Sequence, residues 1–162
     1  MIVEVAGDIL LSKAHALAHG VAPNDPFHQG LALQLRERMP ALYKDFRHYC
    51  QTQHPGPGSL WTWMGPDARL VVNLFTQASA YEHGAKPGRA TTHNVGLALR
   101  ELRRLVEKEH LRSVALPRLA TGVGGLAWQE VLPLVQHHLG DLAIPVVLYT
   151  TYHAGEVAEE GL

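Results

Sequence analysis

Short strand-like runs alternate with helix-like stretches along most of this chain. The strand-like runs are IVEVAG, HALAHG, SLWTWM, ARLVVNLFT, SVALPRL and AIPVVLYT. Between most of them, apolar residues recur at the three- and four-residue spacing of a helix face. Alternation of this kind predicts an α/β fold in three layers, with helices on both faces of a central mixed sheet.

The helix-like stretches have clear apolar stripes and clear interruptions. The first stripe contains Pro40, so we expect two helices that meet near Met39, with Pro40 in the first turn of the second. A second stripe runs from Val95 to Val106, and its opposite face carries arginines that suit a solvated surface better than a nucleic-acid patch. A third stripe begins at Trp128.

Length and charge fit one globular domain. A chain of 162 residues suits a single core, and we expect residues 1–152 to form the domain and the polar tail 153–162 to fray. The formal net charge of -1 gives no global positive field, so any binding of nucleic acid must be local.

Cysteine and histidine usage argues against disulfides and metals. The single cysteine, Cys50, cannot form an intrachain disulfide, and its amphipathic setting indicates a core residue in a reduced, cytoplasmic protein. The 11 histidines are scattered without ligand spacing, so we expect neither a metal nor a cofactor. No signal peptide or membrane-spanning run is recognisable.

A glycine-rich segment, TGVGG at 121–125, lies between a strand-like run and a helical stripe. Glycine lets the backbone turn sharply, and successive N–H groups before a helix form a concavity for an anion such as pyrophosphate. No Lys-Ser/Thr pair follows, so it is not a P-loop, and the dinucleotide fingerprint is also incomplete. Taken alone, the segment fits a plain strand-to-helix turn equally well.

Three other loops carry groups suited to a nucleotide. Asp8 follows the first strand, where it either caps the next element or accepts a hydrogen bond from an adenine amino group. Gly30 and Leu31 open a helix whose N-terminus can face phosphate. Tyr149 and Tyr152 end the last strand, either as a stacking surface for a base or as core and rim aromatics.

The order of these loops resembles the macrodomain family of ADP-ribose-binding modules. GDIL, GLALQL, PRLATGVGGLAW and a tyrosine at the last strand carry the resemblance, which covers residues 1–152. PRLATGVGGLAW looks like the subclass that includes the terminal ADP-ribose protein glycohydrolase. The chain is most similar to the DarG branch, the antitoxins of DarT–DarG toxin–antitoxin systems. That branch implies hydrolytic removal of ADP-ribose from thymine bases of single-stranded DNA, where a toxin has attached it from NAD.

The resemblance implies roles at the adenine end of ADP-ribose. Asp8 would hold the adenine amino group, and the Ile9 backbone would hold a ring nitrogen. Tyr152 would cover the base, with Tyr149 competing for that role.

It also implies roles at the other end of the ligand. Gly30 and Leu31 would lie along the diphosphate and distal ribose, and Asn24 would rim that ribose. The residues that would wrap both groups with backbone N–H donors are Thr121, Gly122, Val123 and Gly124.

The catalytic position departs from the glycohydrolase pattern. That subclass uses a lysine after the LVVNLFT strand, whose amine attacks the anomeric carbon or acts as an acid. Here Ala80 stands at the expected position, with Gln77 as the alternative, and Lys86 lies further along the loop. Gly124 stands where the related enzyme has an Asp. The chain is either a binding-only macrodomain or a variant that lost its lysine, naturally or deliberately, and we favour the second.

The expected partners are ADP-ribose, ADP-ribosylated single-stranded DNA and a cognate ADP-ribosyltransferase toxin. Tyr81, His83 and Lys86 would lie on the DNA side, since aromatic stacking and local positive charge suit single strands, although a simple loop explains them too. Toxin contact would come mainly from a C-terminal part outside this chain, which we expect to be a fragment. The rival functions are a non-catalytic reader of ADP-ribose or mono-ADP-ribosylated protein, and a protein ADP-ribosyl-ester hydrolase.

Overall fold

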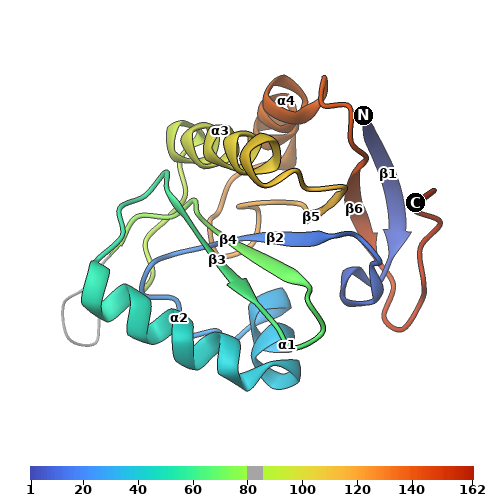
Figure 1. Ribbon diagram of the computed structural model, residues 1–162. Helices are drawn as coiled ribbons and strands as arrows, with labels where there is room; N and C mark the ends of the chain where they lie inside the picture. The colour runs from blue at the N-terminus through green and yellow to red at the C-terminus, as the bar shows by residue number, and fades with distance from the viewer. Residues whose placement is uncertain (80–85) are drawn as a thin grey trace.

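The computed structural model describes residues 1–79 and 86–162, and six strands among them form one sheet (Figure 1). The strands are β1 (Ile2–Gly7), β2 (Ala16–Val21), β3 (Leu60–Met64), β4 (Leu70–Phe75), β5 (Val114–Pro117) and β6 (Val146–Tyr152). Their spatial order is β1-β6-β5-β2-β4-β3. Neighbours pair in parallel except β3 and β4, which pair antiparallel. The prediction of a mixed central sheet is therefore confirmed.

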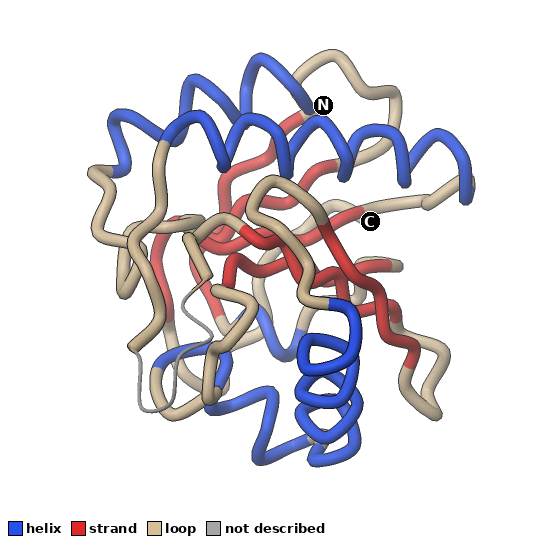
Figure 2. Tube along the Cα trace, turned by 90° about the vertical axis from the view of Figure 1, so that its left-hand side faces the viewer, coloured by secondary structure: helices blue, strands red, loops and turns tan. Residues whose placement is uncertain are grey.

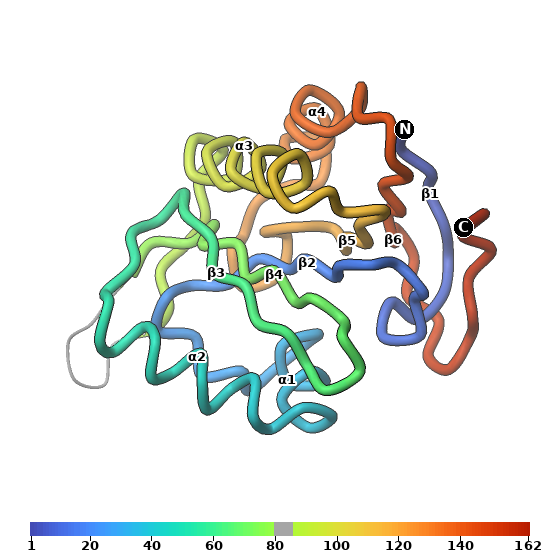
Figure 3. The backbone as a smooth tube through the Cα atoms, viewed as in Figure 1, coloured from blue at the N-terminus to red at the C-terminus, as the bar shows by residue number. Residues whose placement is uncertain are grey.

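Helices cover both faces of this sheet. They are α1 (Gly30–Arg38), α2 (Pro40–Gln53), α3 (Thr92–Glu109) and α4 (Trp128–Leu139), with a short 3-10 helix η1 (Ile9–Leu11). α1 and α2 lie on one face, and α3 and α4 lie on the other (Figure 3). A view turned by 90° shows the strands between the two helical layers (Figure 2). The three-layer prediction holds, and so does the break at Pro40, which is the first residue of α2.

The alternation of side chains along β2 divides the core in two. Ala16 and Ala18 pack into the cluster under α3 and α4, whereas Leu17 and Val21 pack into the cluster under α1 and α2. Successive residues of a strand point to opposite faces, so β2 needs apolar side chains on both. His19 lies on the α1–α2 face within this otherwise apolar strand, and it is 3% exposed.

The arginine-bearing face of α3 is a solvated helix surface, as the sequence favoured. Arg103 forms an ion pair with Glu107 one turn on, with 3.0 Å between Nε and Oε1. Arg104 pairs with Glu101 at 2.9 Å. The same helix buries its apolar stripe, from Val95 to Val106, against the sheet. Neighbouring acids neutralise these arginines, so they form no separate basic patch.

The C-terminal tail packs against the domain, so the expectation of a frayed tail is wrong. Glu160 is 8% exposed, and its carboxylate accepts hydrogen bonds from the Ser12 hydroxyl, the Lys13 N–H and the Tyr149 hydroxyl. The Asp8 N–H donates to the Glu156 carbonyl at 2.8 Å. Three donors around one buried carboxylate hold the tail, which passes beside β1 (Figure 1).

Cys50 is buried, as expected, and burial raises the pKa of its thiol to about 12. The thiol therefore packs as a small apolar group. Within residues 1–79 and 86–162, no helix combines the length and hydrophobicity needed to cross a membrane.

Candidate functional site

Two adjoining cavities open at the carboxyl ends of the parallel strands. The glycine-loop cavity has a volume of about 330 Å³ and the tyrosine cavity has a volume of about 270 Å³. They share three wall residues, Gly30, Leu31 and Pro117. Ligands of open α/β sheets collect at this edge, so the joined cavities form the candidate site.

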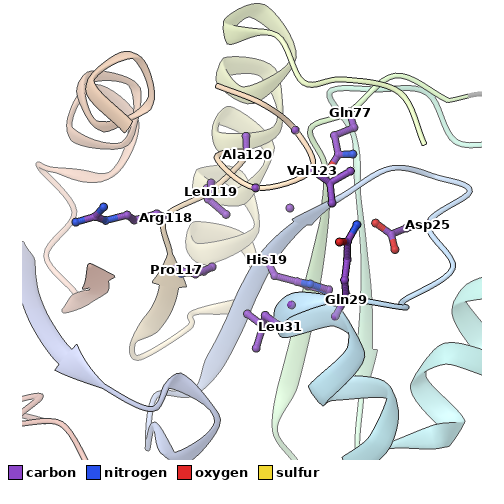
Figure 4. A pocket seen from close by; sticks show the side chains of 15 residues that line it. His19, Asp25, Gln29, Leu31, Gln77, Pro117, Arg118, Leu119, Ala120 and Val123 are labelled. Atoms are coloured by element: carbon purple, nitrogen blue, oxygen red, sulfur yellow. The ribbon is translucent and has the colours of Figure 1, made fainter. Parts of the chain in front are cut away.

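The glycine-loop cavity is built from the end of β2, the loop after it, the start of α1, the segment after β4, and the end of β5 with the segment after it. Its polar side chains are His19, Asp25, Gln29, Gln77 and Arg118, and Figure 4 shows Asp25, Gln29 and Gln77 gathered near Val123. The Arg118 guanidinium points away from this group in the same view and lies 5.8 Å from the Trp128 ring centroid.

The glycine segment presents backbone donors that have no partner in the part of the chain described. The N–H groups of Gly125 and Leu126 close the turn by donating to the carbonyls of Gly122 and Ala120. No described residue accepts from the N–H of Gly122, Val123 or Gly124. Consecutive unpaired N–H groups form a concavity suited to an anion.

The N-terminus of α1 supplies the second set of donors. Leu33 donates to the carbonyl of Gln29 at 3.3 Å, and the Gln29 side chain does not cap the helix. The N–H groups of Gly30, Leu31 and Ala32, in the first turn, have no acceptor among the described residues. Gly30 has φ +62 and an added Cβ would meet nothing within 4 Å, so glycine is needed here for its backbone angle.

His19 is fixed by hydrogen bonds that run along one rung of the sheet. His19, Asn73 and Trp61 are register partners across β2, β4 and β3. The Asn73 amide donates to the Trp61 carbonyl at 3.2 Å, so its Oδ1 accepts from His19 Nε2–H at 2.7 Å. Burial lowers the pKa of His19 to about 4, so this ring is neutral at pH 7.

Asp25 is held in the wall by its own loop. Its Oδ1 accepts from the Phe27 N–H at 2.8 Å, and its own N–H donates to the Ala22 carbonyl at 3.0 Å. Burial raises the pKa of the Asp25 carboxyl, partly offset by N–H donors of Phe27 and Ala22 and by the charge of His28. The sequence interpretation did not single out Asp25, although the Asp-Pro step in a polar loop after a strand was a usable signal.

Gln77 lies in the same wall but is committed to structure. Its side chain is 3% exposed, and Nε2 donates to the Gly88 carbonyl at 2.9 Å. Gln77 also bridges to Ala90, which ties together the two described ends of the loop. Ala80, Tyr81 and His83 lie outside the described residues. Lys86 is exposed and is not among the residues that line either cavity.

Both candidate tyrosines line the tyrosine cavity, but one is buried and the other is exposed. Tyr149 is buried and its hydroxyl donates to Glu160 at 2.9 Å; burial and the neighbouring Glu160 carboxylate raise its pKa. Tyr152 is 54% exposed, and its hydroxyl accepts from Gln34 Nε2 at 3.1 Å. A ring that is open on one side can stack on a base, which favours Tyr152 over Tyr149.

Some predicted residues lie beside the cavities rather than in their walls. Ile9 lines the tyrosine cavity, but Asp8 does not. Asp8 is buried, and its carboxylate caps η1 through Leu10 N–H and also accepts from Gly155 N–H, both at 3.0 Å. Asn24 is half-buried in the loop after β2. The Thr121 hydroxyl donates to the Arg118 carbonyl at 3.0 Å. Neither Asn24 nor Thr121 lines the glycine-loop cavity or the tyrosine cavity.

Gly124 has no room for a side chain. A Cβ built there would come within 2.6 Å of the Ala120 carbonyl oxygen, a backbone atom that cannot swing away. An aspartate at this position therefore requires a different loop path. In residues 1–79 and 86–162, no group of three or more His, Cys, Asp or Glu side chains could hold a metal ion.

Curated relatives are similar to this chain along most of its length. A DNA ADP-ribosyl transferase–DNA ADP-ribosyl glycohydrolase fusion protein from Thermosipho africanus is 27% identical over 90% of this chain and 40% of its own. A DNA ADP-ribosyl glycohydrolase from Thermus aquaticus is 30% identical over 83% of this chain and 37% of its own. The chain thus spans about 40% of the length of the curated relatives it matches.

Solved structures share the fold over nearly the whole chain. The macrodomain of Thermus aquaticus DarG superposes with a TM-score of 0.80 at 27% identity, covering 93% of this chain and 98% of its own. Thermosipho africanus DarTG, solved in complex with ADP-ribose, gives a TM-score of 0.78 at 23% identity over 96% of this chain and 42% of its own. Residues 17–135 match the sequence profile of the Macro domain. The chain belongs to the Macro domain family.

Proposed function

We propose that this chain binds ADP-ribose across the two joined cavities and removes it from thymine bases of single-stranded DNA. The observation that carries the proposal is the pairing of two sets of unpaired backbone donors, at Gly30–Ala32 and at Gly122–Gly124, around one opening. A diphosphate needs many donors in a small space, and backbone N–H groups supply them without a positively charged side chain.

The tyrosine cavity takes the adenine in this proposal. Ile9, Leu31 and Tyr152 offer apolar and aromatic contact, and the cavity adjoins the donors at the start of α1. The Asp8 carboxylate already accepts two backbone N–H groups, so it reaches the adenine amino group only through a remaining lone pair. The predicted contact of Asp8 with adenine therefore competes with its capping role.

The glycine-loop cavity takes the distal ribose. Its anomeric end lies beside Asp25, Gln29 and Gln77, on the side of the cavity away from the tyrosines. The predicted wrapping residues Gly122, Val123 and Gly124 line this cavity, which supports their assignment. Asn24 and Thr121 do not line this cavity, so in this proposal they affect the ribose only by shaping the loops that contain them.

The names of the relatives support DNA as the carrier of the ADP-ribose. The Thermus aquaticus and Mycobacterium tuberculosis relatives are DNA ADP-ribosyl glycohydrolases, and the Thermosipho africanus relative is fused to a DNA ADP-ribosyl transferase. We extend to this chain an antitoxin role against such a transferase. Lys86, with Tyr81 and His83, remains our candidate for the DNA side.

A reader that binds ADP-ribose without turnover is the second candidate. It is favoured by one observation: the described residues that line the glycine-loop cavity include no lysine. A binding module needs only the backbone donors and the base-stacking ring, and the described walls contain both.

Turnover on defined substrates separates these functions. A single-stranded oligonucleotide carrying one ADP-ribosylated thymine should lose its ADP-ribose on incubation with the protein, seen as faster electrophoretic migration and release of free ADP-ribose. A protein ester-linked to ADP-ribose through Glu serves as the parallel substrate, and unmodified oligonucleotide serves as the control.

Measuring ADP-ribose binding in the same experiments distinguishes a hydrolase from a reader. Free ADP-ribose in excess of its Kd should raise the Tm, since a ligand that binds only the folded state stabilises it. Binding without release from either substrate would leave the reader function, and absence of binding at millimolar ADP-ribose would reject both.

A further inference from the structure

Three ionisable side chains among the described residues line the glycine-loop cavity: His19, Asp25 and Arg118. His19 is buried and neutral, and its Nε2–H is committed to Asn73. The Arg118 guanidinium points away from Asp25, Gln29 and Gln77 (Figure 4) and lies 5.8 Å from the Trp128 ring centroid. Asp25 is the one carboxylate of the three, and its side chain lies in the cavity wall with Gln29 and Gln77 (Figure 4).

We propose that Asp25 is the general base of the glycosidic hydrolysis, a role that rests on the proposed function. The carboxylate stands in the wall with Gln29 and Gln77, at the end of the cavity assigned to the anomeric carbon (Figure 4). It lies on the loop after β2, whereas the expected catalytic lysine belongs after β4. The chain would thus use a different loop for its chemistry.

The loop holds Asp25 in a fixed orientation. Oδ1 accepts from the Phe27 N–H at 2.8 Å, and the buried Phe27 ring packs against Tyr43 and Phe46. Arg36 on α1 donates to the Pro26 carbonyl at 2.9 Å, which ties the same loop to the helix. The anchored carboxylate lines the cavity, where it can hold a water, and a general base must be positioned in this way.

The reaction is then a direct displacement by water. A water on Asp25 gives its proton to the carboxylate as its oxygen bonds to the anomeric carbon. The bond from that carbon to the base nitrogen breaks, and the nitrogen keeps the electron pair. The proton held by Asp25 returns through solvent to the nitrogen, so the products are free ADP-ribose and an intact thymine.

The surroundings of Asp25 set the direction of its pH dependence. Among the described residues, the titratable and charged groups around Asp25 are His28 in the same loop, His19 on β2, Arg36 on α1 and Arg118 after β5. Burial outweighs the charge of His28 and keeps the pKa of Asp25 above its ordinary value. A general base works as the carboxylate, so activity falls as the pH drops through this raised pKa.

The test compares two aspartates that make the same local turn. Asp25→Asn keeps an oxygen for the Phe27 N–H but cannot accept a proton, so kcat on the ADP-ribosylated oligonucleotide should fall about 100-fold or more. Its Kd for ADP-ribose should stay within about threefold, because the phosphate donors are untouched. Asp67→Asn is the matched control: Asp67 accepts from Arg69 N–H at 3.1 Å in an exposed turn outside the site.

The wild-type pH profile tests the same role without any variant. kcat/KM should decline toward acid, and in Asp25→Asn the residual activity should lose this decline. An active protein whose Asp25→Asn variant keeps kcat, or whose wild-type profile is flat, overturns the role of Asp25 but not the function. A protein that binds ADP-ribose and releases none overturns both the hydrolase function and the base.

Discussion

Gly124 shows how one residue can restrict the chemistry of the loop. Its Cα lies so close to the Ala120 backbone that a Cβ would be 2.6 Å from the carbonyl oxygen, while Gly124 itself accepts from the Ala90 N–H at 3.0 Å. The loop therefore depends on the absence of a side chain here. Gly122, two residues earlier in the same loop, has open space around its Cβ position.

Gly124→Ala should lower the free energy of unfolding by about 1–3 kcal/mol, the usual cost of forcing an extra group into a filled site. The same change should weaken ADP-ribose binding, because the backbone donors move with the loop. Gly122→Ala is the control and should leave stability within about 0.5 kcal/mol. Denaturant unfolding followed by tryptophan fluorescence measures both, and equal stabilities for the two variants would contradict the packing argument.

The C-terminal tail is the segment whose structure differs most from the one that its composition predicts. The ten residues after β6, most of them polar or small, return along the domain because Glu160 reaches a buried position next to Ser12 and Tyr149. The tail also contacts the start of η1, through Glu156 to Asp8 and through Gly155 to the Asp8 carboxylate. It thereby supports the side of the tyrosine cavity formed by Ile9.

Glu160→Ala should destabilise the protein by about 1–3 kcal/mol, since it leaves buried donors without an acceptor. The exposed neighbour Glu159 supplies the matched control, and Glu159→Ala should change stability little. Thermal unfolding of both variants measures the difference. If the two Tm values agreed with that of the wild type, the tail would not be held by the carboxylate.

At the scale of the whole molecule, the two cavities that we assign to one ligand are built from segments that are distant in sequence. The tyrosine cavity joins β1, η1, α1, β5 and β6, and the glycine-loop cavity joins β2, α1, the end of β5 and the loops after β2, β4 and β5. α1 contributes to both, because it lies where the cavities meet. A ligand that spans the opening should therefore respond differently to changes at its two ends.

Adenosine and ADP-ribose distinguish the ends. Tyr152→Ala should weaken both ligands by a similar factor, about 5-fold or more, because stacking of a base on an aromatic ring is lost. Val123→Asp places a negative charge by the diphosphate donors and should weaken ADP-ribose only. NMR titration gives both affinities. A loss of adenosine binding in Val123→Asp would mean that the base lies in the glycine-loop cavity instead.

The periodicity of the sequence was enough to predict the helices and strands and the loops that surround the site. The stripes from Val95 to Val106 and from Trp128 onward became α3 and α4, and the loops flagged after the strands hold Gly30, Gly122 and Tyr152 around the cavities. Strand and helix patterns are local, so they are legible without a fold.

What the sequence alone determined is the order of strands and helices and the loops that meet at their carboxyl ends, since both follow from short-range patterns. Only the tertiary structure decided which polar groups are buried and which partners they have. In the sequence His19 belongs to an apolar strand, and only the fold shows that it is paired with Asn73. In the same way the sequence suggests that Glu160 is a solvated acid, whereas in the fold it accepts a hydrogen bond from Ser12, 148 residues earlier. Burial and hydrogen bonding arise between segments far apart in the chain, so the lowered pKa of His19 and the raised pKa of Asp25 exist only in the folded molecule.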